Sequence, residues 1–189
     1  MGNLVKDVRQ WLKNNAAPVA VVITIIPATM GGGCAVGEDY PDVAIDRNNL
    51  GMAWHAKGEY DKAIEYFELA LASDLKTSGE DHPSVASRRN NLAAAWQAKG
   101  EHDKAIEYFE LALVSDLKTF GEDHPNVATR RNNLGSAWKA KGDYDKAIGY
   151  YEQALASNLK TLGEDHPNVA TMRNNLAAAK AKKDSMFGE

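Results

Sequence analysis

Residues 79–120 read GEDHPSVASRRNNLAAAWQAKGEHDKAIEYFELALVSDLKTF, and a closely similar sequence precedes and follows this segment. The segment 37–78 is identical to this stretch at 32 of 42 positions, and the segment 121–162 at 29 of 42, without a gap. The GED turn starts once more at Gly163, again after 42 residues. A fixed period of this length predicts a solenoid, in which each unit packs against its neighbours.

The first half of each unit has the pattern of a helix. In 79–120, Pro83 falls in the first helical turn, where its missing N–H does no harm, and Asp81 or His82 is available as the cap. Gly100 provides the C-terminal stop. The apolar stripe of this helix recurs at spacings of seven and four, at Val85, Leu92 and Trp96.

The second half predicts another helix, from about His102 to Thr119. Its expected buried side consists of Ala105, Phe109, Ala112, Leu113 and Leu117. Two of these alanines recur in the neighbouring units, as Ala63 with Ala70 and as Ala147 with Ala154. Such small side chains let two helices approach closely, so each unit is expected to be a tight helical hairpin.

These residues resemble the tetratricopeptide repeat, in the 42-residue form of kinesin light chains and of bacterial signalling proteins. The signature of the first helix is Leu50-Gly51 with Trp54, Leu92-Ala93 with Trp96, Leu134-Gly135 with Trp138, and Leu176-Ala177 without an aromatic. The signature of the second is Tyr60, Ala63, Phe67 and Ala70, with His102 replacing tyrosine and Tyr151 replacing phenylalanine in later units. The resemblance implies an all-α right-handed superhelix of about three and a half repeats, and a non-catalytic scaffold that binds proteins.

The expected organisation divides the chain at the repeat boundaries. A segment 1–36 precedes three full repeats, 37–78, 79–120 and 121–162, and then come a first helix alone at 163–183 and a tail at 184–189. One position departs from the family, because an arginine replaces the usual apolar residue at Arg47, Arg89, Arg131 and Arg173. We expect the stems of these arginines to be covered, while their guanidinium groups reach an acid or a helix end.

Paired asparagines in the middle of each first helix are the candidate binding residues. Asparagine is a mediocre helix former, so its repetition there needs another reason. The resemblance implies that the first helices line a concave groove in which asparagines bond the backbone of a bound peptide. It assigns to this groove Asn48, Asn90, Asn132 and Asn174, flanked by Ile45, Ser87, Thr129, Thr171, Met52, Ala94, Ser136 and Ala178, and extended by His55, Gln97 and Lys139. A second interpretation stays open: the asparagines bond neighbouring helices and hold the solenoid together.

Composition and motifs argue against several other functions. The net charge is −4, and residues 1–36 supply three bases and one acid, which leaves −6 for the rest and no basic patch for nucleic acid. Cys34 is the sole cysteine, so it could be a buried small residue, a link between chains or a lipid attachment point. The histidines His82, His124 and His166 stand one per repeat, which favours turn capping over metal binding. HExxH, P-loop, GxSxG and GxGxxG motifs are absent, so we expect no enzyme activity, metal or cofactor.

Self-assembly is the second function that the sequence allows, as a homo-oligomer or filament built by head-to-tail stacking. The first helix of the fourth unit has no second helix in the sequence, so its apolar stripe is expected to need a partner. The expected assembly contacts are Leu4, Val8, Trp11, Leu12, Val169, Met172 and Leu176. The partner is therefore a segment of another protein or another copy of the chain.

The segment before the repeats supports three interpretations. Leu4 to Leu12 has the pattern of an amphipathic helix, and an apolar run at 19–26 lies between two prolines. Even residues 16–30 are short for a membrane span, which leaves membrane contact without a crossing as an alternative for this stretch. A basic start, an apolar stretch and GGGC at 31–34 resemble a lipoprotein signal, but Gly31 replaces the expected leucine. The segment is thus a docking segment or buried strand, a signal or anchor, or disordered, and a cytoplasmic location is expected unless 1–34 is a signal.

Overall fold

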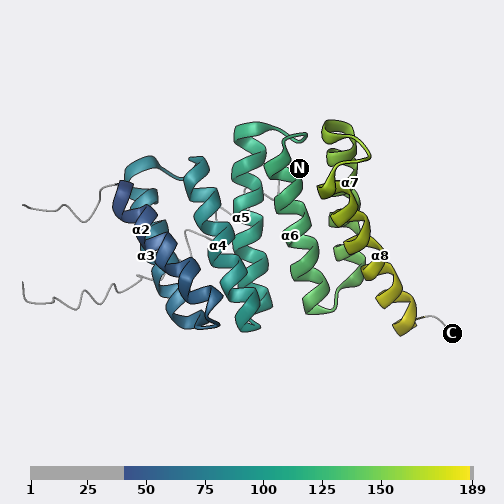
Figure 1. The fold of residues 1–189 in the computed structure, drawn as a ribbon, viewed down its shortest axis with the longest axis horizontal. Coiled ribbons are helices and arrows are strands. Elements are labelled where there is room, and N and C mark those ends of the chain that lie inside the picture. The colour runs from purple at the N-terminus through teal and green to yellow at the C-terminus, as the bar shows by residue number, and fades with distance from the viewer. Residues whose placement is uncertain (1–40, 188–189) are drawn as a thin grey trace, which may run out of the picture. The chain divides into compact units, whose positions relative to one another are not determined.

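The computed structural model describes residues 41–187, and within this range every element is an α-helix (Figure 1). We call the first helix of each repeat an A helix and the second a B helix. The A helices are α2 (Pro41–Ala56), α4 (Pro83–Lys99), α6 (Pro125–Lys141) and α8 (Pro167–Phe187). The B helices are α3 (Tyr60–Ser78), α5 (His102–Phe120) and α7 (Tyr144–Leu162). This arrangement confirms the predicted all-α solenoid of about three and a half repeats.

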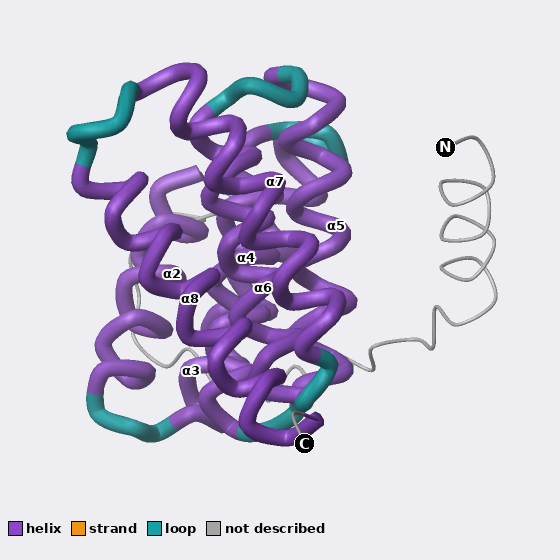
Figure 2. The backbone as a smooth tube through the Cα atoms, turned by 90° about the vertical axis from the view of Figure 1, so that its right-hand side faces the viewer, coloured by secondary structure: helices purple, strands orange, loops and turns teal. Residues whose placement is uncertain are grey.

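The helices pack in the order of the sequence. Each B helix lies between the A helix of its own repeat and the A helix of the next repeat, and neighbouring A helices also touch. Figure 2, viewed from the α8 side, shows described residues forming helices joined by short loops. The helices α2 to α8 therefore form one continuous stack.

Capping residues set the start and end of the A helices as predicted. The Nδ1 atom of His82 accepts a hydrogen bond from the backbone N–H of Ser84 at 3.2 Å, next to Pro83 in the first turn. His124 and His166 do the same in the following repeats. Gly100 ends α4 at φ 93°, a left-handed conformation that is costly for other residues.

The last A helix is longer than the sequence suggested. The sequence predicts a tail at 184–189, but α8 continues to Phe187. Asp184 stands where Gly58, Gly100 and Gly142 follow the earlier A helices with positive φ. Without that glycine nothing forces the backbone out of the helical conformation, so the tail prediction is wrong for 184–187.

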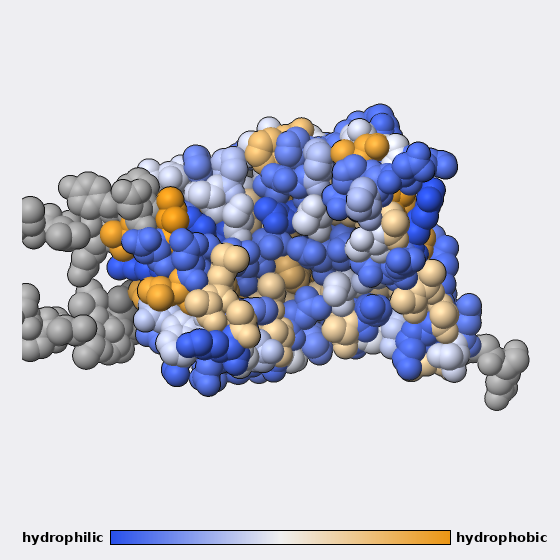
Figure 3. All heavy atoms as spheres, in the orientation of Figure 1, coloured by the Kyte–Doolittle hydropathy of each residue, from blue (hydrophilic) through white to orange (hydrophobic). Residues whose placement is uncertain are grey.

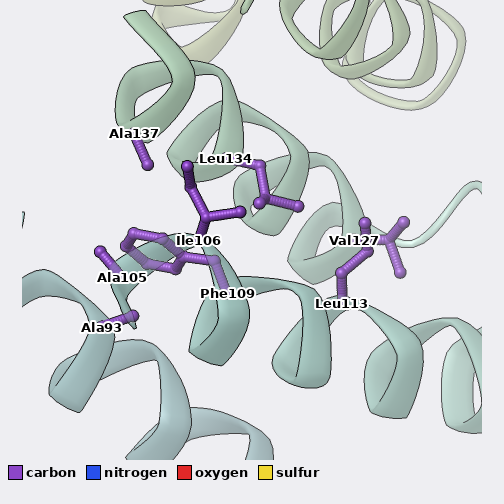
Figure 4. Close-up of a cluster of buried hydrophobic side chains, with 8 residues drawn as sticks. All are labelled: Ala93, Ala105, Ile106, Phe109, Leu113, Val127, Leu134 and Ala137. Atoms are coloured by element: carbon purple, nitrogen blue, oxygen red, sulfur yellow. The ribbon is translucent and has the colours of Figure 1, made fainter. Parts of the chain in front are cut away.

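Interlocking side chains from three successive helices form the core. Figure 4 shows one such cluster, in which Ile106 and Phe109 of α5 lie between residues of α4 and α6. Its members are Ala93, Ala105, Ile106, Phe109, Leu113, Val127, Leu134 and Ala137. Close contact also explains the glycine of the signature, because a Cβ added at Gly51 would lie 2.6 Å from the ring of Phe67. The rings of Phe67 and Tyr151 thus pack almost on the backbone of their own A helices, at Gly51 and Gly135.

Comparison of the A helices shows which positions each neighbouring B helix covers. α8 follows a B helix but, within residues 41–187, precedes none; Ala179 is fully buried there and Ala170 is exposed. Among the described helices, α2 precedes a B helix but follows none. Its burial pattern is the reverse of that in α8, because Ala44 is 1% exposed, whereas Ala53 is open to solvent. An A helix therefore has one face for the preceding B helix and another for the following one.

This division corrects the expected assembly surface. Val169 is fully buried and Met172 is 5% exposed, because the preceding helix α7 covers both. Leu176 is half-buried beside a cluster that contains Tyr151. The prediction that another chain covers this stripe of α8 is wrong for Val169 and Met172, because both residues lie on the face that packs against the preceding B helix. The other expected contacts, Leu4, Val8, Trp11 and Leu12, lie outside the described residues.

The unusual arginines of the repeat behave differently along the stack. Arg89 has a side chain 8% exposed, and its Nη2 donates to Glu80 Oε1 at 3.1 Å. Arg131 donates to the backbone oxygen of Glu122 at 3.3 Å. These two confirm the expectation of a covered stem and a bonded head. In α8 the side chain of Arg173 is 47% exposed, so the expectation of a covered stem is wrong there, because no described helix follows α8.

A second set of arginines, which the sequence reading missed, links each B helix to the next A helix. Arg88 Nε donates to Asp74 Oδ2, and Arg130 Nε to Asp116 Oδ2, both at 2.9 Å. At the third junction, the pair is instead Asn158 and Met172, with Nδ2 3.3 Å from the sulfur. Both partners change together, and this parallel change at a spacing of 14 residues is the signal that reveals the contact in the sequence.

Candidate functional site: the asparagine ladder of the A helices

The paired asparagines form a ladder that runs across the A helices. Asn91 Nδ2 donates to Asn48 Oδ1 at 2.8 Å, joining α4 to α2. The same bond joins α6 to α4, from Asn133 to Asn90 at 2.8 Å, and α8 to α6, from Asn175 to Asn132 at 2.9 Å. The first asparagine of one repeat therefore accepts from the second asparagine of the next, and stitching between helices is present in the structure.

The ladder uses only one amide atom of each asparagine. Asn90 and Asn132 accept through Oδ1, which leaves their Nδ2 groups without a hydrogen bond to any described residue. Both side chains are half-buried, and neither Nδ2 atom is a fully buried polar atom that lacks a hydrogen bond. The Oδ1 atoms of Asn133 and Asn175 are free in the same sense. A row of unused donors and acceptors thus accompanies the row of ladder bonds.

The ladder ends in two asparagines that take no part in it. Asn49 and Asn174 are exposed, and within residues 41–187 neither makes a hydrogen bond through its amide. Asn48, by contrast, is only 6% exposed, and its Nδ2 lies 3.5 Å from the sulfur of Met52. The structural and the binding interpretations can therefore be separated experimentally at the two ends.

The three residues expected to extend the groove, His55, Gln97 and Lys139, lie on the A helices α2, α4 and α6. Gln97 Nε2 donates to Ser136 Oγ at 3.1 Å, which ties α4 to α6 about two turns beyond Asn90 and about one turn beyond Asn132. The ring of His55 lies 5.4 Å from that of Tyr60, and its Nε2 is buried without a hydrogen-bond partner. Lys139 is half-buried and makes no ion pair with a described residue. The structure brings Gln97 and Ser136 together and keeps His55 close to its own hairpin.

The surface changes character along the stack. In α2 the residues before and after the ladder are Ile45 and Met52, which are 47% and 54% exposed. The corresponding residues of the later A helices are small: Ser87, Ala94, Thr129, Ser136, Thr171 and Ala178. The apolar side chains are therefore concentrated at the α2 end, while small polar and methyl groups flank the ladder elsewhere.

Most titratable groups with shifted pKa values lie on the B helices or their caps; the exceptions are Lys99 of α4 and Lys183 of α8, where hydrogen bonds to Asp61 and Asp145 raise the pKa. Burial raises the pKa of the Glu110 carboxyl, an effect that Lys146 opposes, and burial also raises the pKa of Glu107. The backbone N–H of Lys146 lowers the pKa of Asp143 by bonding its carboxylate at the start of α7. Packing, capping and hydrogen bonding account for these shifts. Among the described residues, no group of three or more His, Cys, Asp or Glu side chains is placed to hold a metal ion.

Comparison with known protein families shows to which family the chain belongs. The tetratricopeptide repeat family matches residues 42–113, 89–160 and 133–184. This chain belongs to the tetratricopeptide repeat family. Proteins of this family are in general non-catalytic scaffolds for protein interactions. The helices of this chain have the fold of that family.

Solved structures place the chain beside kinesin light chains, as its repeat signature indicated. BtubC (BKLC) from P. vanneervenii is 31% identical with a TM-score of 0.70; the match covers 77% of this chain and 59% of that one. A putative kinesin light chain of Podosopora anserina with nearly identical TPR-like repeats is 26% identical with a TM-score of 0.67, over 97% of this chain and 79% of that one. The Sgt2 TPR domain from Aspergillus fumigatus is 29% identical with a TM-score of 0.57, over 77% and 82%. The chain thus spans little more than half of BtubC, and no curated protein matches it.

A separate finding concerns membranes. None of the described helices combines the length and the apolar character that a membrane crossing requires.

Proposed function

We propose that this tetratricopeptide repeat protein is a scaffold that holds an extended segment of a partner protein along its asparagine ladder. The observation that carries the proposal is the set of asparagine amide atoms that the ladder leaves without a hydrogen bond. Each of Asn90, Asn132, Asn133 and Asn175 uses one amide atom to bond the neighbouring helix, and its other amide atom has no bond to a described residue. The ladder holds these side chains in place before a ligand arrives, which lowers the entropy cost of binding.

The chemistry of the ladder suits a polypeptide backbone. An extended segment presents alternating N–H and C=O groups, and an asparagine amide can donate to one and accept from the other. The unused Nδ2 of Asn90 and Asn132 would donate to carbonyl groups, and the unused Oδ1 of Asn133 and Asn175 would accept from amides. Small neighbours such as Ser87 and Ala94 leave room for a backbone to approach these atoms. Recognition of main-chain groups gives affinity, and side-chain contacts along the segment give specificity.

Peptide selection on the intact chain tests the proposal. Random dodecamer peptides displayed on phage are selected against the immobilised full-length protein, and the dissociation constants of the selected peptides are measured by fluorescence anisotropy. Asn49→Ala and Asn174→Ala remove exposed amides that make no ladder bond, so the stack keeps its internal bonds. We expect each variant to weaken binding about threefold to tenfold, the loss of one hydrogen bond to a ligand.

The matched control is Gln153→Ala, which changes an exposed amide on the B helix α7. We expect this variant to bind the selected peptides like the unchanged chain, and all three variants to melt at the same temperature. If no peptide is selected, or if both asparagine variants bind as the control does, the ladder only stitches the helices. Sedimentation at several concentrations accompanies the assay, and a receptor of this kind is expected to stay monomeric.

A further inference from the structure

The outer face of α2, separate from the ladder, is built to receive a B helix. Four positions of an A helix face the preceding B helix, and in α2 they are Val43, Asp46, Leu50 and Ala53; we call them the α2 end face. The equivalent valine, leucine and alanine are fully buried in α4 and in α6. In α2, Leu50 is 47% exposed and Ala53 is open to solvent. Strongly hydrophobic spheres gather at this end of the described helices in Figure 3.

The side chains of the α2 end face keep the apolar character of a buried junction. Valine, leucine and alanine occupy the same positions as in the internal repeats, although no described helix covers them. Residues with no partner need not stay apolar, and the exposed Leu50 on this face favours association. The face therefore has the composition of an internal junction without its occupant among the described residues.

The fourth position is different and specifies the occupant. Arg88 and Arg130 stand there in the internal repeats and bond Asp74 and Asp116 of the preceding B helix. In α2 this position is Asp46, which is exposed and pairs with no described base. The charge of the A-helix partner is thus reversed. A helix that carried an aspartate opposite Asp46 would bring two carboxylates together, so the complementary residue is a base.

The described helices of a second copy cannot satisfy this requirement. Each of α3, α5 and α7 is already enclosed between two A helices, so a folded copy presents no free B helix. At the relevant position these helices also carry Asp74, Asp116 and Asn158, which lack a positive charge. We propose that the α2 end face docks an amphipathic helix of another protein, with an arginine or lysine opposite Asp46.

A pair of stapled peptides tests this proposal. Both copy residues 60–78, the B helix α3, with a hydrocarbon staple between the exposed positions 65 and 72. One keeps Asp74, and the other carries Asp74→Arg. Binding of each labelled peptide to the full-length chain is followed by fluorescence anisotropy. We expect the arginine peptide to bind about 10- to 100-fold more tightly, because only it places a base opposite Asp46.

The reciprocal variant supplies the control. Asp46→Arg introduces the arginine that α4 and α6 carry at this position, and should reverse the preference in favour of the aspartate peptide. Asn49→Ala and Asn174→Ala should leave both affinities unchanged, so a failure of the ladder proposal is distinguishable from a failure here. The proposal is overturned if neither peptide binds, if both bind equally, or if the preference survives Asp46→Arg. It is also overturned if binding appears only after Val8→Asp, because the face is then held by the chain's own amino-terminal segment.

Discussion

Replacing Arg130 by methionine should lower the free energy of unfolding by about 3 kcal/mol, because it leaves a buried carboxylate without its partner. The side chain of Asp116 is 1% exposed and that of Arg130 is 9% exposed, with 2.9 Å between Nε and Oδ2. Breaking a buried ion pair typically costs about 3–5 kcal/mol, and the slight exposure of Arg130 favours the lower value. For a domain of this size, that loss corresponds to a fall in Tm of about 6–12 °C.

The same chain contains the compensated form of this junction. Adding Asp116→Asn to Arg130→Met reproduces the pair at the third junction, where Asn158 Nδ2 lies 3.3 Å from the sulfur of Met172. Because both charges are then removed together, the double variant should recover to within about 1 kcal/mol of the unchanged protein. The coupling between the two substitutions is therefore expected to be about 2 kcal/mol or more.

Urea unfolding followed by circular dichroism measures these differences. A solenoid can unfold in parts, so hydrogen exchange of α5 and α6 should accompany the global measurement. The reasoning about the buried pair is refuted if Arg130→Met loses less than about 1 kcal/mol, or if the double variant is no more stable than the single one.

Other substitutions test the core, the ladder, the B helices and the absence of a metal requirement. Ala105→Trp should abolish cooperative melting, since Ala105 is fully buried and a ring overpacks that crossing; unchanged dichroism and Tm would contradict the assigned core. Gln97→Ala removes the bond to Ser136 and should cost only about 0.5–1.5 kcal/mol in urea unfolding, so a larger loss would show a deeper structural role. Burial raises the folded-state pKa of Glu110 above its unfolded value, so its contribution to stability is present at low pH and is lost as the pH rises through the folded pKa. Glu110→Gln should therefore raise Tm at pH 7, with the difference vanishing near pH 4, about the unfolded pKa; a difference that does not depend on pH would disprove this cause. A chelator such as EDTA should leave Tm unchanged, and a shift beyond experimental error would reveal a bound metal.

The repeat itself determined the fold from the sequence. Proline at the first turn, histidine at the cap and glycine after each A helix act within a few residues, so their effects could be read without the tertiary structure. Where the glycine is replaced by Asp184, the same local logic accounts for the longer α8. The alternation of helices in the hairpin also followed from the spacing of apolar residues, because a helix buries one stripe whatever its neighbours are.

At several positions the sequence allows two structures equally well, and only the tertiary contacts decide between them. Four near-identical repeats give Ala44 and Ala170 the same local sequence role, yet one is buried and the other exposed, because burial depends on which B helix stands beside each A helix. The ladder register, from Asn91 to Asn48, likewise joins residues of different repeats, and repetition alone does not say which asparagine of a pair donates to the neighbouring A helix. Local propensity therefore fixes the helices of this protein, whereas the order in which they stack fixes which of their faces remain open to a partner.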